Sequence, residues 1–119
     1  MEDRLNPVPA EGVDESTLGG YAAVHGRAPG FEGPDGSAYT VAVEAEEVAE
    51  GGAWAAYLVF VRWADEGSAI MGHVETDDLA RGPTREAATE AVEALPLAEV
   101  KRILDEAVER KREWGAAGE

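Results

Sequence analysis

The apolar residues change their spacing once along the chain, and this change constrains the fold class more than any other feature. From Tyr39 to Glu75 the apolar residues alternate with polar ones or form runs rich in β-branched and aromatic side chains, as in strands. From Thr84 onward they recur at every third or fourth position, as in amphipathic helices. Because the strands precede the helices, the pattern predicts an α+β domain: a three- to four-stranded antiparallel sheet followed by two helices packed on one face.

Three long strands are expected. Residues 39–44 alternate, with Tyr39 starting the apolar face. Residues 53–63 are the most apolar part of the chain, so we predict the central strand there. Residues 69–75 alternate again, which places His73 and Glu75 on the same face. A further short strand is predicted for residues 21–25.

Two helices are expected after the strands. Thr84 suits the cap of a helix that extends to Leu95 and has an alanine-rich apolar face. Pro96 ends this helix and fits the first turn of a second one. The second helix carries an apolar stripe formed by Leu97, Val100, Ile103, Leu104, Ala107 and Val108.

The 119 residues are enough for one domain. We expect a mobile acidic tail at residues 1–20, a single α+β domain at 21–113 and a frayed C-terminus at 114–119. The longest apolar run, residues 53–61, is far shorter than the ~20 residues that a membrane-spanning helix needs. The first residues show no basic region followed by an apolar stretch, so a cytoplasmic location is expected.

The charge of the chain constrains its partners. Ten Lys and Arg oppose 25 Asp and Glu, which gives a formal net charge of −15. Such a surface repels nucleic-acid phosphates but attracts a basic protein, unless it serves only solubility. Direct nucleic-acid binding is therefore not expected. The acids are concentrated in the strand region, so candidate partner-binding residues are Glu44, Glu46, Glu47, Glu50 and, as an aromatic anchor beyond the helical stripe, Trp114.

Few residues offer catalytic or metal-binding chemistry. The chain has no cysteine and only two histidines, His25 and His73. His73, Glu75 and Asp77 are the candidate ligands for a divalent ion, and a small metal-binding enzyme centred on His73 is one alternative function. No serine lies in a nucleophile-elbow motif and no phosphate-binding glycine motif is present. The sequence therefore favours a noncatalytic role without a cofactor.

One stretch resembles a known family. Residues 39–44 are followed by Glu50-Gly51-Gly52, an aromatic strand, a third strand and Gly82-Pro83-Thr84-Arg85-Glu86-Ala87 at the start of a helix. This order over residues 39–95 resembles the HicB-like antitoxin fold. The resemblance implies a small module that binds a basic toxin or another protein through its acidic surface.

The apolar stripe of the second helix supports another alternative. It predicts that Leu97–Val108 pair with a second copy, which makes the chain a self-associating domain or homodimer.

Overall fold

The change of periodicity corresponds to the change from strands to helices. The computed structural model describes residues 14–48, 51–65, 67 and 69–117, with the side chains of 112–117 left out. Along the chain the elements are α1 (Leu18–His25), β1 (Gly30–Glu32), β2 (Ala38–Glu47), β3 (Trp54–Trp63), β4 (Ile70–Glu75), β5 (Ala80–Gly82), α2 (Arg85–Glu93) and α3 (Leu97–Ala117). The predicted α+β class is confirmed.

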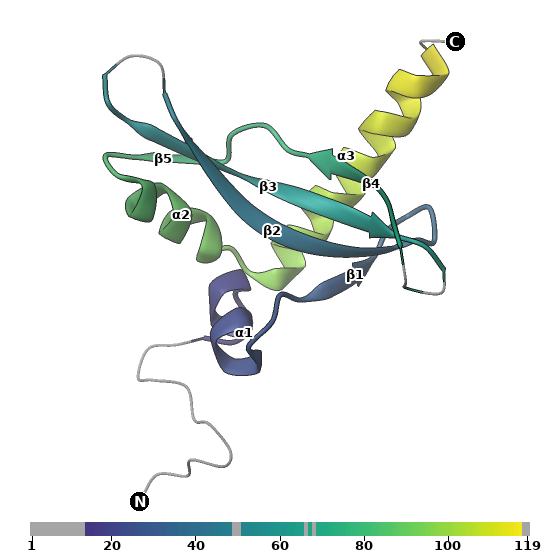
Figure 1. Ribbon diagram of the computed structural model, residues 1–119, viewed down its shortest axis with the longest axis horizontal. Coiled ribbons are helices and arrows are strands. Elements are labelled where there is room, and N and C mark those ends of the chain that lie inside the picture. Colours follow the sequence, from purple (N-terminus) through teal and green to yellow (C-terminus); the bar gives the residue numbers. More distant parts are fainter. Residues whose placement is uncertain (1–13, 49–50, 66, 68, 118–119) are drawn as a thin grey trace, which may run out of the picture.

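The strands form one antiparallel sheet with β3 at its centre (Figure 1). The order is β1-β2-β3-β4. β5 and β4 pair with the same edge of β3, β5 with its first residues and β4 with its later ones. The β2–β3 register brings Val41 opposite Phe60 and Val43 opposite Leu58, so the apolar residues of both strands share one face. The predicted central strand is therefore confirmed.

That apolar face of the sheet packs on the helices. Phe60, Leu58 and Ala56 of β3 are fully buried in one core with residues of both later helices, among them Val92 of α2 and Leu104 of α3. Figure 1 shows α3 crossing behind the strands. The two predicted helices are thus placed on one face of the sheet, and burial of their apolar stripes supplies most of the stabilisation.

Local signals explain where α2 begins. The Thr84 hydroxyl accepts a hydrogen bond from the amide of Ala87 at 3.0 Å, as the predicted cap requires. Beyond α2, helix α3 continues to Ala117, past the start of the segment expected to fray. The last two residues of the segment expected to fray, 118 and 119, lie outside the described residues.

The strand predicted at residues 21–25 is wrong, because this segment belongs to α1. The Thr17 hydroxyl accepts a hydrogen bond from the amide of Gly20 at 3.0 Å and thereby caps the helix. Gly26, at a φ of 70°, ends it in the left-handed conformation that glycine adopts without strain. Capping at both ends therefore outweighs the β propensity of this short segment.

The first described residues join the fold rather than a tail. Leu18 is buried, its amide donates to the carbonyl of Leu95 at 2.9 Å, and the amide of Leu97 donates to the carbonyl of Ser16 at 2.7 Å. Residues 14–20, expected in the mobile tail, are thus hydrogen-bonded to the segment that joins α2 and α3. We call these two hydrogen bonds the clasp. Residues 1–13 of that predicted tail lie outside the described residues.

Among the described residues, no helix is long and apolar enough to span a bilayer.

Candidate functional site

The face of the sheet turned away from the core carries the candidate site. On β3, Tyr57, Val59, Val61 and Trp63 alternate with the buried core residues and are only half-buried. The Trp63 indole nitrogen donates to the Thr40 hydroxyl at 2.9 Å, which fixes the ring across β2. This row, which we call the outer stripe, is an apolar and aromatic surface outside the core cluster.

Carboxylates flank the outer stripe on both neighbouring strands. The register places Glu44 of β2 opposite Tyr57 and Glu75 of β4 opposite Val59, and both glutamates are exposed. Glu46 lies two residues further along β2 and points to the same face. The outer stripe is therefore bordered by negative charge on two sides.

The carboxylates around the outer stripe affect the ionisation of Tyr57. Partial desolvation raises the pKa of its hydroxyl, and the surrounding carboxylates Glu46, Glu75, Glu44 and Asp78 raise it further. A field that disfavours a phenolate favours a cation at the same place. The Tyr57 end of the outer stripe is thus an aromatic ring in a negative potential.

The predicted partner-binding residues are divided by the structure. Glu44 and Glu46 lie beside the outer stripe, whereas Glu47 is opposite Trp54 and so is aligned with the helix side of the sheet. Glu50 lies outside the described residues, and Trp114 belongs to α3 without a described side chain.

The three candidate metal ligands do not converge. His73 and Glu75 share a face as predicted, with 3.5 Å between the imidazole Nε2 and a carboxylate oxygen. Asp77 is directed instead to Arg110 of α3, at 3.9 Å. Within the described part of the chain, no three His, Asp or Glu side chains are placed to hold a metal ion together.

The two histidines lie on different elements. His25, on α1, lies 3.2 Å from a carboxylate oxygen of Glu15 and stacks on Tyr21 with 4.2 Å between the ring centres. His73 lies on β4 beside Glu75. Each imidazole therefore has its own carboxylate, and the structure gives them no shared site.

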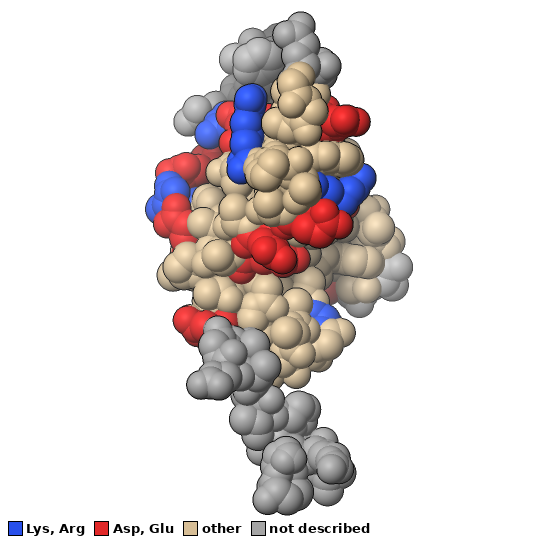
Figure 2. All heavy atoms as spheres, turned by 90° about the vertical axis from the view of Figure 1, so that its left-hand side faces the viewer, with Lys and Arg blue, Asp and Glu red and all other residues tan. Residues whose placement is uncertain are grey.

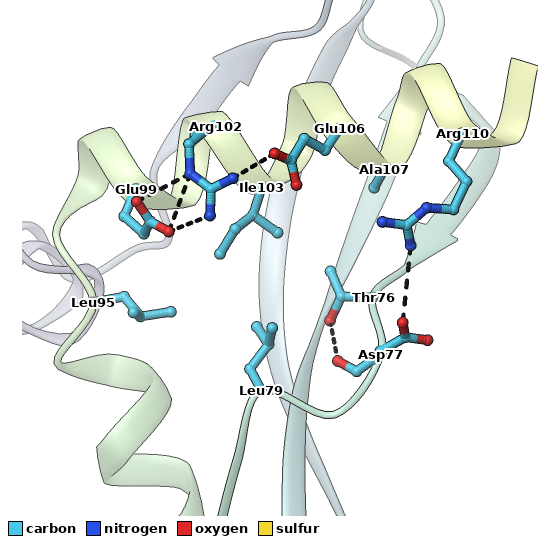
Figure 3. Close-up of a pocket in the computed structure, with 10 residues that line it drawn as sticks. All are labelled: Thr76, Asp77, Leu79, Leu95, Glu99, Arg102, Ile103, Glu106, Ala107 and Arg110. Carbon is cyan, nitrogen blue, oxygen red and sulfur yellow. Dashed lines mark hydrogen bonds and ion pairs between the residues drawn. The ribbon is translucent and has the colours of Figure 1, made fainter.

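A groove of about 300 Å³ lies between α3 and the segment after β4 (Figure 3). Leu79, Leu95 and Ile103 point towards one another in it. Its charged residues are paired with one another: Arg102 with Glu99 and Glu106, and Arg110 with Asp77. The groove therefore combines an apolar floor with ion pairs formed between residues of its own lining.

Lys101 and Arg102 of α3 are paired with carboxylates of the same helix. The Lys101 ammonium contacts a carboxylate oxygen of Asp105 at 2.6 Å, and hydrogen bonding to Arg102 lowers the pKa of Glu99. Figure 2 shows basic and acidic side chains interspersed on the end of the molecule that it displays. Lys101 and Arg102 therefore lie among carboxylates and not in an isolated basic patch.

Sequence reasoning missed Tyr57 and the outer stripe. The run from Trp54 to Trp63 is apolar at nearly every position, so periodicity alone does not separate its two faces. The available signal was in the preceding strand, β2, where Glu44 and Glu46 alternate with Val43 and Ala45. The face that carries these glutamates is the face of the sheet turned away from the helices.

Comparisons with protein-family models, with curated proteins and with solved structures find no match to this chain.

Proposed function

We propose that this chain is a noncatalytic module that binds a basic protein partner through the outer stripe and its carboxylate border. The observation that carries the proposal is the position of Tyr57, half-buried between the glutamates of β2 and β4 on the face of the sheet turned away from the core. Aromatic and aliphatic side chains provide contact area, and the surrounding charge selects a cationic partner.

The composition of this surface favours binding over chemistry. Glu44 and Glu46 have no ion pair within the described part of the chain, so they are available to pair with arginine or lysine from outside. The resemblance to HicB-like antitoxins, which bind a basic toxin, agrees with this proposal. A basic partner that forms an interface of standard size would cover the outer stripe and compensate part of the net charge of −15.

The test compares two triple variants that carry the same net charge. Glu44→Gln/Glu46→Gln/Glu75→Gln removes the border of the outer stripe, whereas Glu86→Gln/Glu90→Gln/Glu93→Gln removes three carboxylates from α2. Each tagged protein is incubated at low salt with lysate of its own source, and bound proteins are released by a salt step and identified by mass spectrometry.

We expect the wild type and the α2 variant to retain the same small basic protein and the border variant to lose it. Equal retention by both variants would show that net charge, and not this surface, attracts the partner. Purified candidate and wild type should then bind with an affinity that falls as salt rises. Binding that is insensitive to salt contradicts the proposal.

A further inference from the structure

One edge of the sheet is left unpaired along most of a long strand. β1 pairs only with Ala38–Thr40, so Val41–Glu47 of β2 have β3 on one side and no strand on the other among the described residues. An unpaired strand presents a row of backbone donors and acceptors that can accept another strand. We call these seven residues the free edge of β2.

The register shows which backbone groups face outward. Val48 donates its amide to the carbonyl of Ala53 at 2.7 Å, so this pair is hydrogen-bonded across the hairpin. Because hydrogen-bonded and non-bonded pairs alternate in an antiparallel ladder, Glu46 and Glu44 also bond to β3. The amides and carbonyls of Val43 and Ala45 therefore face away from β3. In the described part of the chain, no hydrogen bond from outside the sheet reaches them.

The side chains at the free edge indicate the chemistry of an added strand. Glu44 and Glu46 are exposed on the face of the outer stripe, while Val43 and Ala45 are half-buried on the helix side. An added strand would place alternate side chains beside these two rows. Its complement is therefore a segment in which basic residues alternate with apolar ones.

We infer that the basic partner presents an extended segment of alternating basic and apolar residues, which adds as a strand to the free edge of β2. The inference rests on the proposed function, since it takes the partner to be basic. A second copy of this chain is a poor occupant, because two such edges would bring their glutamates together and repel each other.

The experiment uses a defined probe, the peptide Val-Arg-Val-Arg-Val-Arg-Val, whose seven residues match the length of the free edge. Ala45→Pro removes one outward amide without removing a bond to β3, and proline is tolerated at such edge positions. Ala45→Val is the matched control, because it changes the side chain and keeps the amide.

Titration calorimetry should show that wild type and Ala45→Val bind the probe alike, and that Ala45→Pro binds about tenfold more weakly or not at all. Glu44→Gln/Glu46→Gln should bind about fivefold more weakly and with less dependence on salt. Unchanged binding by Ala45→Pro, or no binding by the wild type, would overturn strand addition.

Amide exchange on the wild type gives a readout that does not depend on how the proline variant folds. Bound probe should slow exchange at Val43 and Ala45, whose amides face outward, and leave Glu44 and Glu46, already bonded to β3, nearly unchanged. Equal slowing at all four amides would contradict pairing at this edge.

The two proposals fail differently. One outcome is that the probe binds, that its affinity depends on the glutamates, and that Ala45→Pro binds it normally. A cationic ligand then uses the outer stripe without strand pairing, and only the inference is wrong. If the border variant still captures the same basic protein as the wild type, the proposed function itself is wrong.

Discussion

The sheet treats its two long outer edges differently. β4, at one edge, has the carbonyl of His73 covered by the Lys111 ammonium of α3 at 2.8 Å. Its pairing with β3 also shifts register between Arg62 and Trp63. The free edge of β2 has neither feature and carries glutamates instead.

This difference shows two ways to protect a strand from unwanted pairing. A lysine bonded to an edge carbonyl and an irregular register hinder any incoming strand. Glutamates along an edge repel an identical copy but not a basic strand. The β4 edge therefore resists an incoming strand of any sequence, whereas the free edge of β2, in our proposal, accepts a basic one.

Both edges depend on one residue of the strand between them. Phe60 is fully buried and lies opposite Val41 of β2 and Val74 of β4. We expect Phe60→Ala to lower the free energy of unfolding by about 3–5 kcal/mol, because it removes contacts on both sides and leaves a cavity. Urea denaturation measures this loss. Val61→Ala, on the half-buried face of the same strand, is the control and should cost clearly less; equal losses would refute the assignment of faces.

The register shift of β4 lies next to Gly72, which is opposite Arg62 and has a φ of 150°. Few residues with a side chain adopt this conformation, so Gly72→Ala should cost about 1–3 kcal/mol and loosen β4 but not β2. Thermal unfolding gives the overall loss, and amide exchange shows which edge opens. Gly30→Ala on β1 is the control, since its added Cβ would meet only the Tyr39 carbonyl at 3.7 Å. A loss at Gly30 as large as at Gly72 would speak against a strained β4.

Asp35 lies in the turn between β1 and β2, beside the part of β2 that β1 covers. Its carboxylate accepts hydrogen bonds from the Ser37 amide at 3.1 Å and the Tyr39 hydroxyl at 2.9 Å. Burial acts to raise the pKa of Asp35, but these two bonds and the nearby Arg62 outweigh it and hold the pKa below the usual 3.8. The charged form is thus favoured by folding.

A carboxyl group with a lowered pKa stabilises the fold above its unfolded value, and this contribution is lost as the pH falls through the folded value. Asp35→Asn should therefore lower the free energy of unfolding by about 1 kcal/mol at pH 7. Guanidinium denaturation across the acid range should show the difference from the wild type shrinking below pH 3.8. A difference that stays constant down to low pH would exclude this linkage.

The strands and helices with strong periodicity were predictable from sequence, and the short elements were not. The alternation after Tyr39, the apolar run at β3 and the cap at Thr84 each specify their element locally. α1 was missed because its residues were divided between an expected acidic tail (1–20) and an expected strand (21–25), while the helix depends on its caps and on burial of Leu18. The three-residue strands β1 and β5 exist only through pairing with longer neighbours.

For the candidate site, the sequence indicated Glu44 and Glu46 by charge alone. It did not indicate Tyr57, because the direction of a side chain in an apolar run depends on which face the helices cover. Nor did it indicate that Asp77 pairs with Arg110 rather than with His73, since that contact joins β4's end to a helix far along the chain.

The clasp between Ser16, Leu18 and the link at Leu95–Leu97 has a consequence for the order of folding. It joins the start of the described chain to a segment synthesised only after every strand is complete. Contacts so distant in sequence carry a large loop-closure entropy and form after local hairpins. On the ribosome, the β2–β3 hairpin can therefore close early, whereas α1 must wait for residue 97 before it finds its place.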